Sequence, residues 1–302
     1  MADMYAMVSR PGPVEIEVLE ELSPSVSVRR RVGSKVTLRT LEGGPEKSGE
    51  PPIVLLHGRG HAASMWLPLL PALARERRVI AIDLPGFGHS SAEPFGRGST
   101  DEAVRFFTDP MELMLMGLGI QEPILIGHSL GGLVSVEIAL RGSLRPRGLG
   151  LIGSMALGPA MSYPSRAFFR AGPERVARVM GPAITRRISN FPDTPQGRKL
   201  SALEYELYSV RGGRPDAAAA FNALFPAVGE AFNRLPHLPE ITCPALLLWG
   251  GRDEVFPPSV AEGAARVMQK PELRIEKDLG HAPHIEAPDR IVPVILDFIA
   301  RL

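Results

Sequence analysis

The sequence of 302 residues has little cysteine and almost no net charge, and each shortage excludes a class of protein. The single cysteine, Cys243, excludes an intramolecular disulfide, so nothing indicates an oxidising compartment. A formal net charge of +1 gives no electrostatic indication of a nucleic-acid or acidic partner. The one tight basic run, Arg29, Arg30 and Arg31, is more typical of a solvated strand or loop.

Long apolar runs are also missing. The longest, such as residues 245–249, are far too short to span a bilayer. The first 12 residues lack a cationic start followed by an apolar core, so we expect no signal peptide. Hydrophobic residues make up 44% and charged residues 22% of the chain, which is ordinary for a globular protein with a sizeable core. We therefore expect a cytoplasmic protein without a membrane span or a nucleic-acid partner.

Short apolar segments alternate with helical patterns over most of the chain. Residues 14–20 and 26–41 have strand character and predict an antiparallel start. The later strands are expected at 53–56, 78–82, 124–126, 149–152, 245–249 and 273–276. Helices are expected at 65–76, 100–118 (with a break or kink at Pro110), 133–140, 259–268 and 288–302. Buried strands of four or five residues separated by helices predict an α/β fold with a parallel sheet covered on both faces.

The alternation stops after Met155 and resumes after Pro244. Between them the chain has a helical pattern interrupted by prolines, and many of its aromatic residues gather there. The sequence therefore predicts a core of residues 1–155 and 239–302, with a helical cap (156–238) inserted over the strand ends.

The most informative motif follows the strand at 124–126. It reads Gly127-His128-Ser129-Leu130-Gly131 and leads directly into an apolar helix. A sharp turn between strand and helix crowds the backbone, and glycines on either side of the serine relieve that crowding because they carry no Cβ. The turn raises the Ser129 hydroxyl above the sheet and aims N–H groups of the new helix at the same place. The motif therefore predicts that Ser129 is a nucleophile.

A serine nucleophile needs a base to take its proton, and the base needs a carboxylate to orient it. Asp253 follows the strand at 245–249 and His281 follows the strand at 273–276, so both are expected at the same edge of the sheet as Ser129. Glu254 is the rival acid and His284 the rival base, and we interpret His284 as a lining or structural residue. The chain order of nucleophile, acid and base favours Asp253 and His281.

The oxyanion formed by attack on a carbonyl needs hydrogen-bond donors. We expect the backbone N–H groups of Leu130, at the helix start, and of Arg59, after the strand at 53–56. The Arg59 side chain could meet an anionic substrate, although a solvent-facing side chain is the simpler expectation.

Together these segments resemble the α/β-hydrolase superfamily over nearly the whole chain. The matching pieces are His57-Gly58, Asp83-Leu84-Pro85-Gly86-Phe87-Gly88-His89-Ser90, Gly127-His128-Ser129-Leu130-Gly131-Gly132, Gly251-Arg252-Asp253 and Gly280-His281. The resemblance implies an eight-stranded, mostly parallel sheet, a helical cap between the sixth and seventh strands, and no cofactor. It also implies that His57 and the Asp83 loop are structural or shape the pocket. We expect no metal site.

The same resemblance narrows the chemistry. A serine at position 129 departs from the dehalogenase and epoxide-hydrolase branches, which have aspartate there. Arg59 before Gly60 departs from the His-Gly-Gly-Pro-Gly pattern of proline iminopeptidases. Carbon–carbon hydrolases of aromatic ring-cleavage pathways typically have Trp beside the histidine, whereas this chain has Ala282.

We therefore expect a carboxylesterase for small to medium acyl esters, working through an acyl-enzyme as a monomer or homodimer. A carbon–carbon hydrolase is the second expectation. Thioester, lactone and perhydrolase chemistry, acyl transfer to an acceptor other than water, and a non-catalytic ligand-binding protein remain open.

Overall fold

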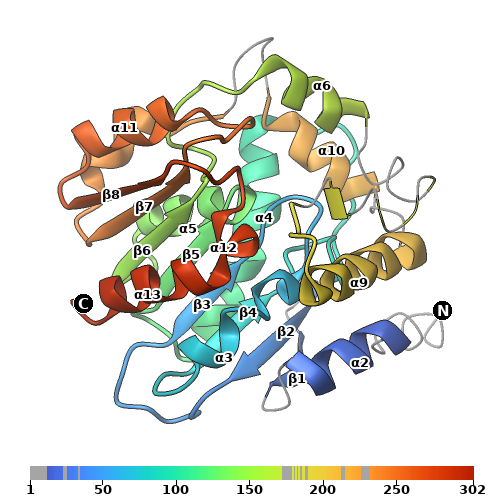
Figure 1. Ribbon diagram of the computed structural model, residues 1–302. Coiled ribbons are helices and arrows are strands. Elements are labelled where there is room, and N and C mark those ends of the chain that lie inside the picture. The colour runs from blue at the N-terminus through green and yellow to red at the C-terminus, as the bar shows by residue number, and fades with distance from the viewer. Residues whose placement is uncertain are drawn as a thin grey trace.

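An eight-stranded sheet runs through the centre of the molecule (Figure 1). The computed structural model describes residues 12–22, 26–32, 35–171, 179, 181, 183, 186–187, 190–211, 215–225 and 232–302. The strand order is β1-β2-β4-β3-β5-β6-β7-β8. The bounds are β1 Ser27–Val32, β2 Thr37–Gly43, β3 Ile53–Leu56, β4 Val79–Ile82, β5 Ile124–His128, β6 Gly148–Ile152, β7 Ala245–Gly250 and β8 Pro271–Glu276.

The pairing is antiparallel only at one edge. β1 pairs with β2, and β2 with β4, in antiparallel register, while every pair from β4 through β8 is parallel. The predicted eight-stranded, mostly parallel sheet is thus confirmed. Its antiparallel edge, however, is not formed by the predicted segments 14–20 and 26–41, because the second segment alone contains β1 and the start of β2. Because the central strands run in one direction, the loops that leave β3, β5, β7 and β8 meet at the same edge of the sheet.

Helices cover both faces of the sheet, and alternate strand residues face alternate layers. Val54 and Leu56 belong to the core layer formed with α4, α5 and α11, whereas Ile53 and Leu55 belong to the layer formed with α3 and α13. The bounds are η1 Ala63–Trp66, α3 Leu70–Leu73, α4 Thr100–Gly117, α5 Leu130–Arg141, α11 Pro258–Val267, α12 Pro283–Glu286 and α13 Pro288–Ile299. Within the described ranges, no helix is long and apolar enough to cross a membrane.

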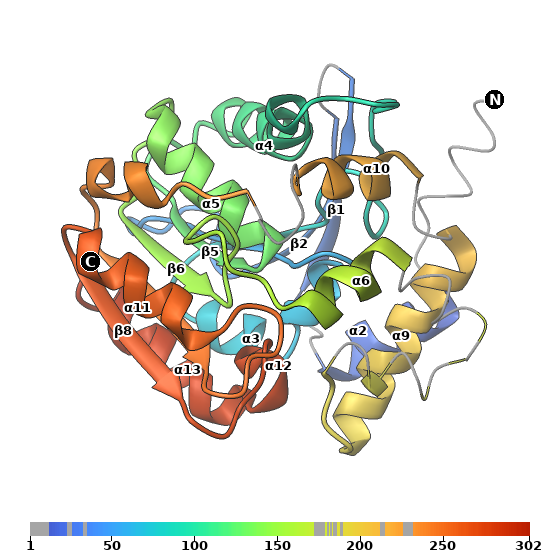
Figure 2. The same ribbon diagram turned by 90° about the horizontal axis from the view of Figure 1, so that it is seen from above.

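The connection between β6 and β7 contains four described helical elements, which are α6 Tyr163–Ala171, α9 Pro195–Arg211, α10 Pro215–Ala223 and η2 Leu235–Glu240. The remaining parts of the predicted 156–238 insertion include residues outside the described ranges. α10 packs on α4. The Asp216 carboxylate accepts the N–H of Phe95 at 2.9 Å, and the Thr100 hydroxyl donates to the Ala223 carbonyl at 2.8 Å. α9 lies beside the N-terminal helix α2 (Pro13–Leu22) in both views (Figures 1 and 2).

The strand predicted at 14–20 is wrong, because the segment forms the helix α2, Pro13–Leu22. The alternation of apolar residues from Val14 suggested a strand. The structure instead buries Glu15 and Val18, three residues apart as on one helix face, and leaves Ile16 44% exposed. Glu15 forms an ion pair with Arg39 of β2, and this buried carboxylate sets the face of the helix.

Prolines act differently in two of the predicted helices. The helix at 65–76, which we expect Pro68 and Pro71 to disturb, is indeed interrupted and forms η1 and the short α3. In contrast, α4 continues through Pro110 without a break. Its buried face, which includes Phe107 and Met111 on either side of the proline, supports the helix through tertiary packing.

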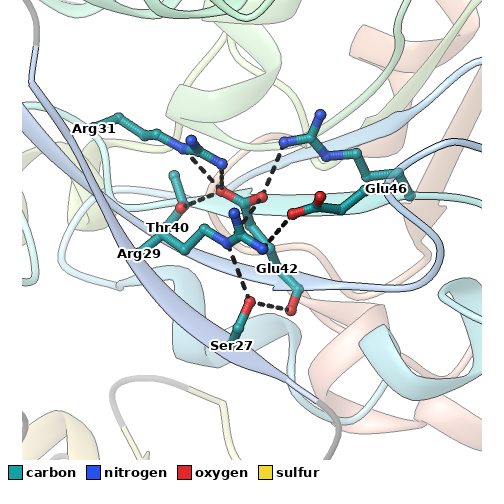
Figure 3. Close-up of polar contacts among 7 residues, drawn as sticks. Ser27, Arg29, Arg31, Thr40, Glu42 and Glu46 are labelled. Carbon is teal, nitrogen blue, oxygen red and sulfur yellow. Dashed lines mark hydrogen bonds and ion pairs between the residues drawn. The ribbon is translucent and has the colours of Figure 1, made fainter.

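The arginine run lies on the edge strand β1, as the sequence indicated. Arg31 Nε donates to Glu42 Oε1 at 3.0 Å, and Arg29 forms an ion pair with Glu46 (Figure 3). Glu42 also accepts the Thr40 hydroxyl at 2.8 Å. Arg29 and Arg31 are therefore paired with carboxylates of β2 and of the loop that follows it.

Candidate active site

Ser129 occupies a strained turn between β5 and α5. Its φ of 51° and ψ of −111° are unusual for a residue with a Cβ. A Cβ on Gly131 would lie 2.1 Å from the Leu56 carbonyl oxygen, and one on Gly127 would lie 2.3 Å from the Gly131 oxygen. Both positions therefore need glycine, and the turn is possible only because the sequence supplies it on each side of the serine.

Asp253 and His281, predicted from separate loops, are brought together. His281 Nδ1 and Asp253 Oδ2 lie 2.9 Å apart, and Asp253 Oδ1 accepts the N–H groups of Val255 (2.8 Å) and Phe256 (2.9 Å). Because the carboxylate can only accept, we assign the His281 proton to Nδ1, which leaves the lone pair of Nε2 able to take a proton. Glu254, the rival acid, is exposed.

The loop after β6 contacts both Ser129 and His281. Ser129 N–H donates to the Ile152 carbonyl at 3.0 Å, and Met155 N–H donates to the Ser129 carbonyl at 3.0 Å. Between them, Gly153 has a φ of +48°, and a Cβ there would lie 2.7 Å from the His281 carbonyl oxygen and 3.0 Å from Nδ1. Ser129 and His281 therefore both pack against the short segment 152–155.

His128 connects the nucleophile turn to the His281 loop. Its Nε2 lies 3.2 Å from the His281 carbonyl oxygen, so this nitrogen carries the proton, and the two rings are 4.8 Å apart. Burial, and then the neighbouring His284, His281 and His61, hold the pKa of His128 well below its usual range. A neutral His128 adds no positive charge beside His281.

His284, the rival base, is fully buried and does not pair with Asp253. Its ring lies 4.6 Å from Trp66 and 4.8 Å from His128. Burial, followed by His61 and His281, lowers the pKa of His284 well below its usual range. The residue therefore packs as a neutral aromatic ring, which is consistent with its interpretation as a lining or structural residue.

The segment Gly58-Arg59-Gly60-His61, called here the 58–61 turn, lies against the nucleophile. His61 N–H donates to the Gly58 carbonyl at 3.2 Å, and Gly60 has a φ of +77°. A Cβ on Gly58 would lie 3.3 Å from Ser129 Cβ. The peptide between Gly58 and Arg59 therefore lies close to Ser129. Ser129 directly precedes Leu130, the first residue of α5, where helix geometry leaves N–H groups without helical partners.

His57 and Asp83 tie the loops below this turn together. His57 Nδ1 donates to the Gly58 carbonyl at 2.7 Å, while Nε2 accepts the Leu84 N–H at 2.8 Å. Burial lowers the pKa of His57 to about 4, so the ring is neutral at physiological pH. Asp83 accepts the Ala63 N–H at 2.6 Å.

One expectation about Arg59 is wrong. Its side chain is only 7% exposed, and its guanidinium lies 4.8 Å above the ring of Phe221 in α10. No local pattern indicated this contact, because residue 221 lies in the insertion, where periodicity does not predict how the helices pack. The aromatic face attracts the cation and keeps it from solvent.

Sequence reasoning also missed His61 and Glu204. His61 Nδ1 bonds to the Glu204 carboxylate of α9, with both side chains largely buried. His61 could have been noticed because it follows the His57-Gly58 motif. Nothing in the sequence connects it to a glutamate 143 residues later.

A profile of the alpha/beta hydrolase family matches residues 53–294. The chain is 31% identical over 280 residues to the dihydrolipoyllysine-residue acetyltransferase component of the acetoin cleaving system from Pseudomonas putida, covering 90% of this chain and 69% of that one. It is 27% identical over 265 residues to 2-hydroxymuconate semialdehyde hydrolase from Pseudomonas sp. (strain CF600), and the match covers 82% of this chain and 87% of that one. It is 26% identical over 265 residues to the pimeloyl-[acyl-carrier protein] methyl ester esterase of Neisseria meningitidis, and the match covers 82% of this chain and 93% of that one.

Among solved structures, a membrane phospholipase A superposes with a TM-score of 0.76 at 25% identity, covering 100% of this chain and 93% of that one. Across the described residues, no group of three or more His, Cys, Asp or Glu side chains is arranged to hold a metal ion.

Proposed function

The chain belongs to the alpha/beta hydrolase family, and we propose that it is a serine hydrolase that cleaves carboxylic esters of small to medium acyl chains. The observation that carries the proposal is the bond between His281 Nδ1 and Asp253 Oδ2, set beside the strained Ser129 turn. A histidine oriented in this way presents Nε2 as a general base, and a serine raised on a strand-to-helix turn is the nucleophile it serves.

In the proposed mechanism, Ser129 Oγ attacks the ester carbonyl while His281 Nε2 takes its proton. Asp253 holds the imidazole through Nδ1 and stabilises the imidazolium, and the N–H groups of Leu130 and Arg59 donate to the oxyanion. The C–O bond then breaks, and the alcohol leaves with the proton from His281. Water, activated by His281, then attacks the acyl-enzyme in the same way. Ser129 takes its proton back from His281, and the carboxylic acid is released.

The proposal gives residues 156–238 the role of a cap. α10 is bonded to the loop at Phe95 and to the start of α4, and its Phe221 meets the guanidinium of Arg59. These contacts support a cap that touches the 58–61 turn directly. The proposal includes a small-molecule ester substrate, a monomer or homodimer, and a cytoplasmic location, the last supported by the single cysteine.

Ester cleavage is preferred because His281 is followed by Ala282, unlike the Trp typical of carbon–carbon hydrolases, and because one relative is a methyl ester esterase. The likeness to 2-hydroxymuconate semialdehyde hydrolase makes carbon–carbon bond hydrolysis the second candidate. The likeness to an acetyltransferase component makes acyl transfer a variant of the same chemistry, in which another acceptor replaces water.

The test is hydrolysis of p-nitrophenyl esters in a chain-length series from acetate to palmitate. Ser129→Ala should abolish turnover without unfolding the protein, while the matched control Ser135→Ala, a buried serine one turn into the same helix, should keep it. The chain-length profile would then give the size of the acyl site. Turnover by Ser129→Ala near that of the parent would overturn the proposal.

The alternatives have their own readouts. Product analysis with added alcohols would reveal acyl transfer. Activity only on vinylogous diketones would indicate carbon–carbon cleavage. Thermal stabilisation by a ligand that is never consumed would indicate a binding protein.

A further inference from the structure

A second bond between histidine and carboxylate lies next to the Ser129 site. His61 Nδ1 contacts Glu204 Oε1 of α9, and the side chains are 9% and 2% exposed. A bond to a buried carboxylate is stronger than one between neutral groups, and breaking it leaves a buried group unsatisfied. The contact joins the core to the insertion between β6 and β7.

His61 is the last residue of the 58–61 turn. Its N–H closes the turn on the Gly58 carbonyl, which also accepts the proton of His57 Nδ1. Gly60 has a left-handed φ of +77°, so the turn conformation depends on what holds its ends. A displacement of the His61 side chain would therefore move the peptide that bears the Arg59 N–H.

The helix that supplies Glu204 is itself fixed. Leu200, Leu203 and Leu207 of α9 are buried in the core layer below it. On its other side, the Glu206 carboxylate accepts the Val14 N–H of α2 at 3.0 Å. Glu204 thus reaches the turn from a helix anchored on two sides.

We propose that Glu204 is a positioning residue that acts through His61 to hold the Arg59 N–H in place for the oxyanion. The inference rests on the proposed function and adds that the oxyanion site is complete only with α9 docked. The donors must lie 2.7–3.1 Å from the oxyanion, and removing one donor costs about 100- to 1000-fold in kcat. A donor that is displaced rather than removed should cost about 10- to 100-fold.

The test breaks the bond from both ends, with Glu204→Leu and His61→Leu. Each folded variant should lose about 10- to 100-fold in kcat and in kcat/KM on the best p-nitrophenyl ester, with KM little changed, because the lost interaction is made only in the transition state. Glu204→Gln, which keeps an acceptor, should recover part of the loss. The double variant should be no worse than either single variant. The control is Arg198→Leu, an exposed position of the same helix whose ion pair with Asp193 belongs to neither anchor, and this variant should keep the parent kcat.

Inhibition by two ketones separates positioning from a merely structural role. In a trifluoromethyl ketone with the acyl chain of the best ester, Ser129 Oγ adds to the carbonyl carbon and the carbonyl oxygen becomes an oxyanion. The matching methyl ketone binds as a neutral analogue of the ground state. The Ki of the trifluoromethyl ketone should rise in parallel with the loss of kcat/KM, and that of the methyl ketone should not.

His61→Leu keeps the test available if Leu at position 204 prevents folding, because His61 is the more exposed partner. Parent values of kcat and of both Ki in either folded variant would overturn the inference. So would equal rises of both Ki. If Ser129→Ala abolishes turnover while these variants match the parent, the proposed function stands and only this inference fails.

Discussion

His128 Nε2 lies 3.2 Å from the carbonyl oxygen of His281, so the residue before the proposed nucleophile holds the backbone of the proposed base. The bond joins the last residue of β5 to the loop after β8, 153 residues later in the sequence. This bond explains how Ser129 and His281 keep a constant relative position although they follow different strands.

Replacing His128 should therefore disturb catalysis without removing a reacting group. His128→Leu removes the hydrogen-bond donor to the His281 carbonyl. We expect kcat/KM to fall by about 10- to 100-fold, because the His281 ring is then no longer held in position relative to Ser129. His128→Gln keeps an N–H at a similar reach and should retain more activity. Ester hydrolysis by both variants, checked for folding by circular dichroism, is the measurement. A folded Leu variant with parent kinetics would rule out this role.

Gly153 gives a second test of the same geometry. Its left-handed φ of +48° makes any side chain strained, and a Cβ would lie 2.7 Å from the His281 carbonyl oxygen. Gly153→Ala should lose about 1–2 kcal/mol of unfolding free energy from backbone strain alone, and kcat/KM should fall as well because His281 must shift.

Gly142 is the matched control for Gly153. Its φ is +71°, and a Cβ there would meet nothing within 4 Å. Gly142→Ala should lose a similar unfolding free energy, about 1–2 kcal/mol, and keep its kinetics. Equal kinetic effects in both alanine variants would show that strain, and not contact with His281, lowers the rate.

The central strands could be predicted from the sequence because a short strand that is buried on both faces consists of consecutive apolar residues. The strand at Ile53–Leu56 has the predicted bounds, whereas the predicted strand at 14–20 is a helix because a buried carboxylate, Glu15, sets its inner face. Propensity and periodicity contain no information about an ion pair with a distant Arg39.

The candidate site shows the same division. Ser129, Asp253 and His281 each follow a strand, so topology alone predicted that they share an edge of the sheet. The contacts of Arg59 with Phe221 and of His61 with Glu204 depend on how the helices of the insertion pack. No local pattern specifies that packing.

Stability should depend on pH through the buried histidines. The pKa of His284 is held well below its usual 6.5 by burial first, so below about pH 6.5 the unfolded chain binds a proton that the folded protein does not. The unfolding free energy is therefore fully present above that pH and is lost as the pH falls. Each such histidine contributes up to about 1.4 kcal/mol per pH unit. His57 and His128 act in the same direction.

His284→Phe separates this effect from packing. Phenylalanine can keep the contact with Trp66 but cannot titrate, and neither ring nitrogen of His284 has a hydrogen-bond partner among the described residues. Urea unfolding of the variant should show a pH dependence shallower than that of the parent by about one proton between pH 6.5 and 5.5. An unchanged slope would mean that His284 binds the same number of protons in the folded and unfolded states over this range, and would contradict the lowered pKa.

The most direct test of the account is to trap the acyl-enzyme. A p-nitrophenyl ester is mixed with the parent protein, quenched in acid within milliseconds and measured by intact mass and peptide mapping. The account predicts one acyl group per chain, on Ser129, formed in a burst of p-nitrophenol and absent from Ser129→Ala. Steady turnover of the ester with no acyl group on Ser129, or with an acyl group on another residue, would contradict it.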